Sequence, residues 1–183
     1  DYLIHQNTAA PMQVLLKDRQ DVYPEVTVCG LTYTVDEFRV QQSPEVFEGT
    51  RYVNAFRLFQ GALDAGGKGA TIIEDSFERE DRSMDDPSVA NLNYVRGVIH
   101  ALLVREALAN TIDDGNDPAS GEDVRQGMFD IDGNTMGDLA QPFDYREDDR
   151  RPTMTGRLFE VTDGSLEFDT TVELPRREDW IGL

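Results

Sequence analysis

The stretch "EVTVCGLTYTVDEF" (25–38) begins as a buried strand and ends in a series of hydrogen-bonding side chains. Capping of the helix predicted after it requires only Thr34 and Asp36. Thr32 and Tyr33 are not explained by capping. A hydroxyl, a phenol and the neighbouring carboxylate of Asp36 can together hold a polar solute. We interpret the end of this strand as one wall of a ligand cleft.

A second group of polar atoms follows the short apolar segment 2–5. Asn7, Thr8 and the free backbone amides of a helix N-terminus that includes Ala9 suit a carboxylate group. In a parallel sheet the carboxyl ends of the strands meet at one edge, where the ligand crevice of such sheets lies. The predicted ligand-binding residues are Asn7, Thr8, Ala9, Thr32, Tyr33 and Asp36.

The sequence contains no clear motif for metal binding, nucleophilic catalysis or phosphate binding. His5 and His100 have no partners at metal-ligand spacing, and no Gly-x-Ser-x-Gly motif occurs. The segment "GGKGAT" (66–71) departs from a phosphate loop. The segment "DIDGNTMGDLAQ" (130–141) departs from a calcium loop in two of its required positions, and only weak calcium binding stays open there. We therefore predict no catalytic residues, no metal site and no cofactor.

The composition restricts the class of partner. The chain has 183 residues, enough for one core or for pieces of two. Its 36 acidic and 17 basic residues give a net charge of −19, which argues against nucleic acids and anionic membranes and suits a protein that works in high salt. The single cysteine, Cys29, excludes an intrachain disulfide and is expected to be an inert, buried thiol.

Strand and helix patterns alternate over the first 56 residues, which predicts βαβ units and therefore an α/β fold with a parallel sheet. The predicted strands are 2–5, 25–30 and 48–56, with a helix that begins after Thr8 and another near 36–41. Downstream, the pattern predicts a loop at 63–69, helices at 70–82, 89–110 and 120–129, strands at 156–161 and 165–174 joined by Asp163-Gly164, and an end whose Trp180 packs back on the fold.

These pieces, in this order, resemble the C-terminal half of solute-binding proteins of ABC transporters of the leucine/isoleucine/valine-binding type. The matching segments are "DYLIHQNTAAPMQVLLKDRQ", "PEVTVCGLTYTVDE", "PEVFEGTRYVNAF", "NLNYVRGVIHALLVREAL", "SGEDVRQGMF" and "FDYREDDRRPTMTGRLFEVTDGSLEF". The resemblance implies the type I periplasmic-binding-protein fold, in which a parallel sheet is flanked by helices and two lobes close about a hinge. It also implies a non-enzymatic, extracytoplasmic receptor that is monomeric at full length and delivers a small molecule to ABC permease subunits. Such receptors are periplasmic or lipid-anchored at the cell surface, and a signal peptide would precede this chain.

Under this resemblance the chain divides into parts of two lobes. Residues 1–55 form a partial ligand-binding lobe, 56–88 the hinge crossing and a connecting helix, 89–140 helices of the other lobe, and 141–183 the closing strands, hairpin and tail. Since the other strands of the second lobe would precede Asp1, we expect the apolar face of the long helix to lack part of its partner. That face contains Leu92, Val95, Ile99 and Leu102.

The resemblance also bears on the ligand. Members of the family hold the ammonium group of an amino acid with a carboxylate after the second strand, and the matching position here is the neutral Thr32. A branched-chain amino acid, an amide, a small organic acid and an aromatic compound all remain candidates. Two other classes of protein stay open: a cytoplasmic ligand sensor of the same fold, and an α/β enzyme.

Overall fold

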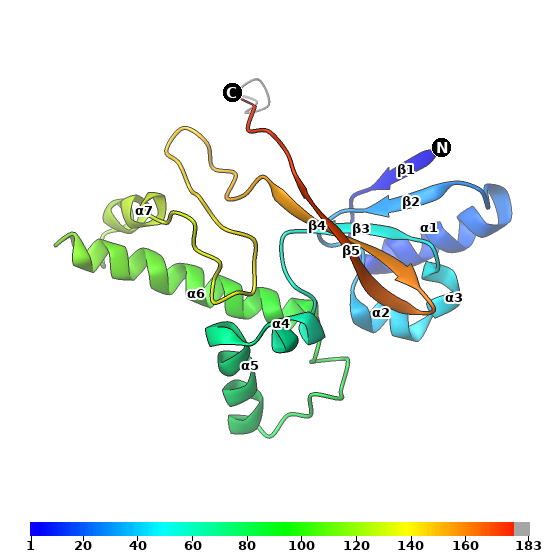
Figure 1. Cartoon of the computed structure of the whole chain (residues 1–183), viewed down its shortest axis with the longest axis horizontal. Coiled ribbons are helices and arrows are strands. Elements are labelled where there is room, and N and C mark those ends of the chain that lie inside the picture. The colour runs from blue at the N-terminus through cyan, green and yellow to red at the C-terminus, as the bar shows by residue number, and fades with distance from the viewer. Residues whose placement is uncertain (178–183) are drawn as a thin grey trace.

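A computed structural model describes residues 1–177 of the chain, so Trp180 lies outside the described residues. Figure 1 shows a sheet with three helices at one end of the molecule and four further helices at the other. The strands are β1 (Tyr2–His5), β2 (Thr27–Gly30), β3 (Arg51–Asn54), β4 (Thr155–Thr162) and β5 (Ser165–Glu173). The helices are α1 (Ala9–Val22), α2 (Glu37–Gln42), α3 (Pro44–Phe47), α4 (Phe59–Ala65), α5 (Gly67–Arg79), α6 (Leu92–Asp113) and α7 (Gly121–Phe129).

The five strands form one sheet in the order β1-β2-β3-β4-β5. The pairs β1–β2 and β2–β3 are parallel, which confirms the predicted βαβ units. The pairs β3–β4 and β4–β5 are antiparallel. Asp163 and Gly164 connect β4 to β5 with φ angles of 52° and 76°, as a two-residue hairpin turn requires, so the predicted hairpin is confirmed as well.

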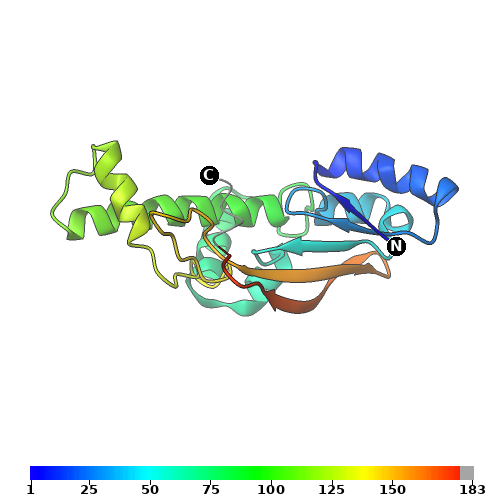
Figure 2. The same cartoon turned by 90° about the horizontal axis from the view of Figure 1, so that it is seen from above.

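Helices α1, α2 and α3 pack on one face of the sheet, beside the parallel strands (Figure 2). The shared core contains Met12, Leu16, Val28, Val35, Val40, Val46, Phe47, Tyr52, Leu92, Phe159 and Val161. Successive residues of a strand point to opposite faces. Tyr2 and Ile4 are exposed, and Cys29 is only half-buried. The prediction of a buried thiol was therefore wrong, because Cys29 points away from the face that these helices cover.

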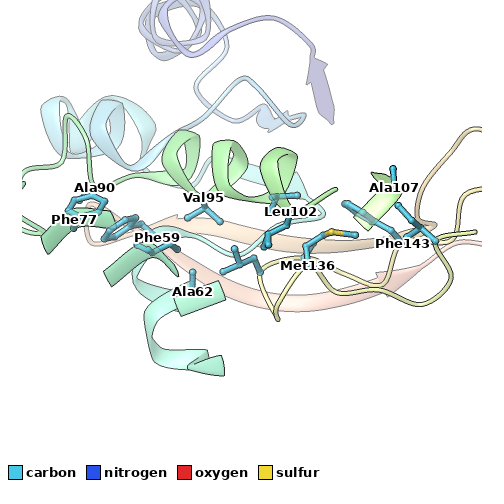
Figure 3. Packing of buried hydrophobic residues seen from close by; sticks show 14 residues of the cluster. Phe59, Ala62, Phe77, Ala90, Val95, Leu102, Ala107, Met136 and Phe143 are labelled. Atoms are coloured by element: carbon cyan, nitrogen blue, oxygen red, sulfur yellow. The ribbon is translucent and has the colours of Figure 1, made fainter. Parts of the chain in front are cut away.

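A second core lies around α6 (Figure 3). Its buried residues come from α4, α5, α6 with the preceding Ala90, and the segment 131–143, which runs back along α6. We expected an uncovered face on this helix, and that expectation was wrong. The face is covered from within the chain, since Leu92, Val95, Ile99 and Leu102 are all buried, with exposed fractions of 0%, 0%, 1% and 9%. No helix within residues 1–177 combines the length and the apolar character needed to cross a membrane.

Two short helices were not predicted. Residues 63–69, expected to be a loop, instead contain the end of α4 and the beginning of α5. Gly66 and Gly67 separate these helices with φ angles of 66° and 76°, a backbone conformation that glycine adopts readily. The four-residue helix α3 was missed because one helical turn leaves almost no periodic pattern in a sequence.

Candidate ligand-binding site

The loops after β1 and β2 leave the sheet at the same edge. His5 lies in register with Gly30, and the Leu31 N–H donates a hydrogen bond of 3.2 Å to the His5 carbonyl. At Gly30 a β-carbon would lie only 2.1 Å from Oγ1 of Thr34. Glycine therefore ends β2, because Thr34 folds back and its hydroxyl donates a hydrogen bond of 2.7 Å to the Leu31 carbonyl.

The loop after β1 presents Asn7 and Thr8 at the surface. The Asn7 side-chain oxygen accepts a hydrogen bond of 2.8 Å from the Thr8 N–H. Thr8 occupies the N-cap position of α1, and its hydroxyl makes no capping hydrogen bond. Ala9 is buried at the start of the helix. The Thr8 hydroxyl and the first amides of α1 are thus placed at the edge of the sheet.

The loop after β2 gathers around an arginine of α6. The Thr32 carbonyl accepts a hydrogen bond of 2.8 Å from the Tyr52 hydroxyl, and it also accepts one from Nη2 of Arg96. The ring of Tyr33, with 61% of the residue exposed, lies over the Arg96 guanidinium at 4.7 Å from ring centroid to Cζ. Thr32 and Tyr33 therefore flank Arg96.

Asp36 and Glu37, which follow β2, accept hydrogen bonds from backbone N–H groups at the N-termini of helices. Asp36 caps α2, since its Oδ1 accepts a hydrogen bond of 2.8 Å from the Arg39 N–H. Glu37 accepts a hydrogen bond of 2.8 Å from the Phe59 N–H through Oε1 and another of 2.8 Å from the Leu92 N–H through Oε2. One carboxylate thus joins α2 to the first residues of both α4 and α6.

Burial raises the pKa values of Glu37 and Tyr52. Burial raises the pKa of the Glu37 carboxyl, although the N–H groups of Phe59 and Leu92 act in the opposite direction. Burial likewise raises the pKa of the Tyr52 phenol, and the charge of Arg96 opposes that shift. The Tyr52 hydroxyl therefore keeps its proton at neutral pH and donates it to the Thr32 carbonyl.

Sequence reasoning missed Arg96. Only 6% of this residue is exposed, and it lies on the buried stripe of α6 between Leu92 and Ile99. The available signal was its spacing, because a residue four after Leu92 and three before Ile99 must share their face. A charged residue on an apolar helix face is rare unless its charge is paired.

Several buried polar atoms have no hydrogen-bond partner in the described part of the chain. They are Nε2 of His5, Nε of Arg19, Oγ1 of Thr50, both amide atoms of Asn54, and Nε of Arg96. His5 ends β1, Asn54 ends β3, and Arg96 contacts the loop after β2. Since buried polar groups are nearly always hydrogen-bonded, this edge of the sheet has capacity for further polar partners.

Comparison with solved structures identifies the architecture. A substrate-binding protein of an ABC transporter from Aeropyrum pernix matches 98% of this chain and 46% of its own, with a TM-score of 0.80 and 18% identity. A branched-chain amino acid ABC transporter protein from Thermus thermophilus with bound valine matches 93% and 45%, with a TM-score of 0.74 and 18% identity. A solute-binding protein from R. palustris in complex with benzoate matches 93% and 42%, with a TM-score of 0.63 and 15% identity.

The chain has the type I periplasmic-binding-protein fold. It spans less than half the length of these solved structures. No family model and no curated protein matches the sequence.

Two cavities of this type I fold lie away from the predicted residues. One of about 840 Å³ lies between α2, α4 and the β4–β5 hairpin, and one of about 670 Å³ lies between α5 and α6. None of the six predicted residues lines either cavity, and neither do any of the unpartnered polar atoms. The unpartnered atoms of His5, Asn54 and Arg96 lie at the carboxyl edge of the parallel strands, whereas those of Arg19 and Thr50 lie elsewhere. Within residues 1–177, no three or more His, Cys, Asp or Glu side chains are grouped to hold a metal ion.

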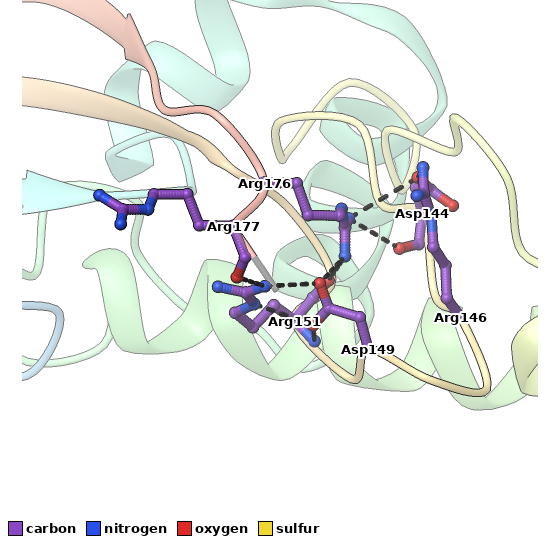
Figure 4. A network of polar contacts seen from close by, with 6 residues as sticks. All are labelled: Asp144, Arg146, Asp149, Arg151, Arg176 and Arg177. Carbon is purple, nitrogen blue, oxygen red and sulfur yellow. Dashed lines mark hydrogen bonds and ion pairs between the residues drawn. The ribbon is translucent and has the colours of Figure 1, made fainter. Parts of the chain in front are cut away.

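A separate polar cluster ties the loop after residue 143 to the C-terminal segment (Figure 4). Asp149, of whose side chain only 4% is exposed, forms ion pairs with Arg151 at 2.8 Å and Arg176 at 2.5 Å. Asp144 forms ion pairs with Arg146 at 2.6 Å and with Arg176 at 3.7 Å. We call Asp144, Arg146, Asp149, Arg151 and Arg176 the arginine–aspartate clamp.

Proposed function

We propose that the protein is a solute-binding receptor, which captures a small molecule at the carboxyl edge of β1–β3 and delivers it to an ABC permease. The observation that carries this proposal is the set of unpartnered buried polar atoms at this edge, those of His5, Asn54 and Arg96. Solved structures of the same fold include proteins bound to valine and to benzoate. A cleft that holds such a solute needs polar groups in a few fixed positions and no reactive nucleophile.

In this receptor Thr8, Tyr33 and the first amides of α1 contact the solute directly. Asn7 shapes the loop after β1, and Thr32 shapes the loop after β2. We assign Asp36 to the capping of α2 rather than to the solute, because its carboxylate already accepts the Arg39 N–H. The function requires no catalytic step.

The receptor acts outside the cytoplasmic membrane, alongside its permease, and is monomeric at full length. The resemblance in segment order and the similarity in fold to substrate-binding proteins of ABC transporters support this placement. A cytoplasmic sensor would bind its solute equally well, so cell fractionation followed by detection of the protein distinguishes the two.

A thermal-shift screen of the full-length protein against amino acids, amides and small organic acids tests capture itself. Binding to the native state raises the melting temperature, by an amount that grows with the logarithm of solute concentration. We expect at least one class to stabilise the protein in this way. A flat response to every class, at concentrations up to the millimolar range, overturns the proposal.

Two substitutions test the assigned contacts. Loss of one hydrogen-bonding partner in a buried site costs about 1–3 kcal/mol, which corresponds to about tenfold or more in affinity. Thr8→Ala and Tyr33→Phe should each weaken binding by this factor and leave the fold intact. Tyr23→Phe is the matched control, since Tyr23 is also 61% exposed but lies at the far end of α1. Equal affinities in all three variants would remove Thr8 and Tyr33 from the site.

A further inference from the structure

Two arginines line one cavity from two different segments of the chain. Arg57 lies between β3 and α4, and Arg157 is a residue of β4, in register with Asn54. Both line the cavity of about 840 Å³ between α2, α4 and the β4–β5 hairpin. Figure 1 shows that the chain runs between the sheet and the helical end of the molecule at both places. The cavity is separate from the predicted solute site, because none of the residues predicted to bind the solute lines it.

Each of these guanidinium groups is held through its Nε side and keeps free donors on its other side. Nε of Arg57 donates a hydrogen bond of 2.6 Å to the Asp138 carbonyl. With its amide oriented to satisfy both groups, Gln141 accepts hydrogen bonds from Nε of Arg157 at 3.1 Å and from Nη2 at 3.3 Å. Within residues 1–177, Nη1 and Nη2 of Arg57 and Nη1 of Arg157 donate to no protein atom. These three nitrogens are therefore available to a ligand.

The two positive charges have no counter-ion in the described part of the chain. None of the ion pairs within residues 1–177 includes Arg57 or Arg157, so no carboxylate oxygen lies within 4.0 Å of their side-chain nitrogens. Burial lowers the pKa of the Arg157 guanidinium, and the nearby charge of Arg57 lowers it further, so the two groups repel each other. Arginine stays protonated at physiological pH, and loss of a proton cannot relieve this repulsion. An anion between the two side chains relieves it.

The other walls of the cavity restrict the size of such an anion. The Phe168 ring lies 5.7 Å from Cζ of Arg157 and covers one side of that guanidinium. Four carboxylates also line the cavity, those of Glu37, Asp64, Asp85 and Glu167. A large anion would extend towards these carboxylates and be repelled by them, whereas a small anion can remain beside the arginines.

We propose that Arg57 and Arg157 form a binding site for a small tetrahedral oxyanion, inorganic phosphate or sulfate, which lies between their guanidinium groups. The planar fork of N–H groups in arginine matches the spacing of two oxygens of such an anion. The bound anion joins the segment after β3 to β4 and strengthens the connection between the sheet and the helical end. This site is additional to solute capture and does not depend on it.

Calorimetric titration of the full-length protein with inorganic phosphate, and separately with sulfate, tests this site. Both series are run in chloride buffer at constant ionic strength, from micromolar to millimolar anion, so that general screening does not change. We expect saturable binding of at least one of the two anions, and the comparison identifies which. Arg57→Gln and Arg157→Gln should each weaken that binding about tenfold or more, because each removes charge-assisted hydrogen bonds. Lysine at either position keeps the charge without the fork and should restore part of the affinity.

Arg125→Gln is the matched control for charge removal, because Arg125 lies on α7 and lines neither cavity. It removes the same charge from the protein and should leave the affinity for phosphate and sulfate unchanged. Far-UV circular dichroism establishes that each variant is folded, and the wild-type titration is informative even if one variant does not fold.

The outcomes decide between this site and its absence. If neither anion binds the wild type saturably, the proposed site does not exist. Binding that survives in both Arg57→Gln and Arg157→Gln, or that Arg125→Gln weakens as strongly, overturns the role of this arginine pair. No solute is present in these titrations, so their result is independent of the proposed receptor function.

Discussion

Two polar regions of this molecule differ in the partners of their buried charged side chains, which are oppositely charged in one region and neutral in the other. In the arginine–aspartate clamp the charged groups form ion pairs. The Asp149 side chain is almost inaccessible to solvent and is paired with two arginines. At the N-terminal end of α6, Glu37 meets two backbone N–H groups, and Arg96 meets a carbonyl, a phenol and an amide oxygen. We refer to Glu37, Tyr52 and Arg96 as the α6 entry.

The two regions differ in the kind of partner that each charged side chain has. In the clamp each carboxylate is paired with two arginines, and the network joins the C-terminal segment to the loop around residue 149. At the α6 entry the charged groups are instead solvated by neutral dipoles, and their hydrogen bonds join α2 and the loop after β2 to the beginning of the long helix.

The largest effect is expected from Glu37→Ala. This change leaves the N–H groups of two buried residues, Phe59 and Leu92, without an acceptor. Each unsatisfied buried group costs about 1–3 kcal/mol, so we expect the free energy of unfolding to fall by roughly 2–6 kcal/mol. Urea unfolding measures the loss, and Glu45→Ala is the control because Glu45 is exposed. If both variants lose the same small amount of unfolding free energy, solvent reaches the N–H groups of Phe59 and Leu92, and the α6 entry does not exclude water.

Tyr52→Phe should have the next largest effect. It removes the hydroxyl that donates to the Thr32 carbonyl and accepts from Arg96, in a residue that is 1% exposed. The ring and its packing remain, so we expect a loss of about 1–2 kcal/mol in the free energy of unfolding. Chemical denaturation alongside the exposed control Tyr23→Phe measures it. A variant as stable as the wild type would show that Arg96 alone satisfies the Thr32 carbonyl.

The destabilisation caused by a substitution should depend on salt concentration in the arginine–aspartate clamp and much less at the α6 entry. Asp149→Asn removes a charge from the clamp, whose arginine partners Arg151 and Arg176 have side chains that are 28% and 20% exposed. Salt screens such partly exposed pairs, so the destabilisation caused by Asp149→Asn should shrink between low and high ionic strength. The effect of Tyr52→Phe should change much less, since it removes no charge and its hydrogen bond with Arg96 is buried. Parallel salt dependences in the two variants would contradict this contrast.

The sequence predicted the parts of the fold that local patterns encode. The order of strands and long helices, the parallel pairing of the first three strands and the Asp163-Gly164 hairpin all follow from periodicity and turn chemistry. The exit of the loops after β1 and β2 from one edge follows from the parallel pairing.

The α6 entry could not be predicted, because its contacts are long-range. Arg96 lies 64 residues from Thr32, and Glu37 lies 22 and 55 residues from the N–H groups that it accepts. Hydrogen bonds between residues so far apart in the sequence leave no periodic pattern. The cover on the apolar face of α6 was missed for a related reason, since the segment 131–143 that supplies part of it has no regular secondary structure.

The smallest expected effect is a pH dependence of opposite sign in the two regions. Burial raises the pKa of Glu37 above its ordinary value, so the folded state holds this proton more tightly than the unfolded state. Hydrogen bonds from Arg151, together with Arg176, lower the pKa of Asp149 well below its ordinary value, so the folded state releases this proton more readily.

These shifts fix the direction of each change. The stability of the wild type relative to Glu37→Gln should fall as pH rises from the ordinary glutamate range through the raised folded pKa, because the buried carboxyl must then carry a charge. Its stability relative to Asp149→Asn should fall in the other direction, as pH drops below the ordinary aspartate range and the ion pairs with Arg151 and Arg176 are lost. Unfolding free energies of the three proteins across the acidic and neutral range test both trends. Two trends of the same sign would mean that Glu37 is stabilised as an anion like Asp149, and the contrast between the α6 entry and the clamp would then be one of partner type alone.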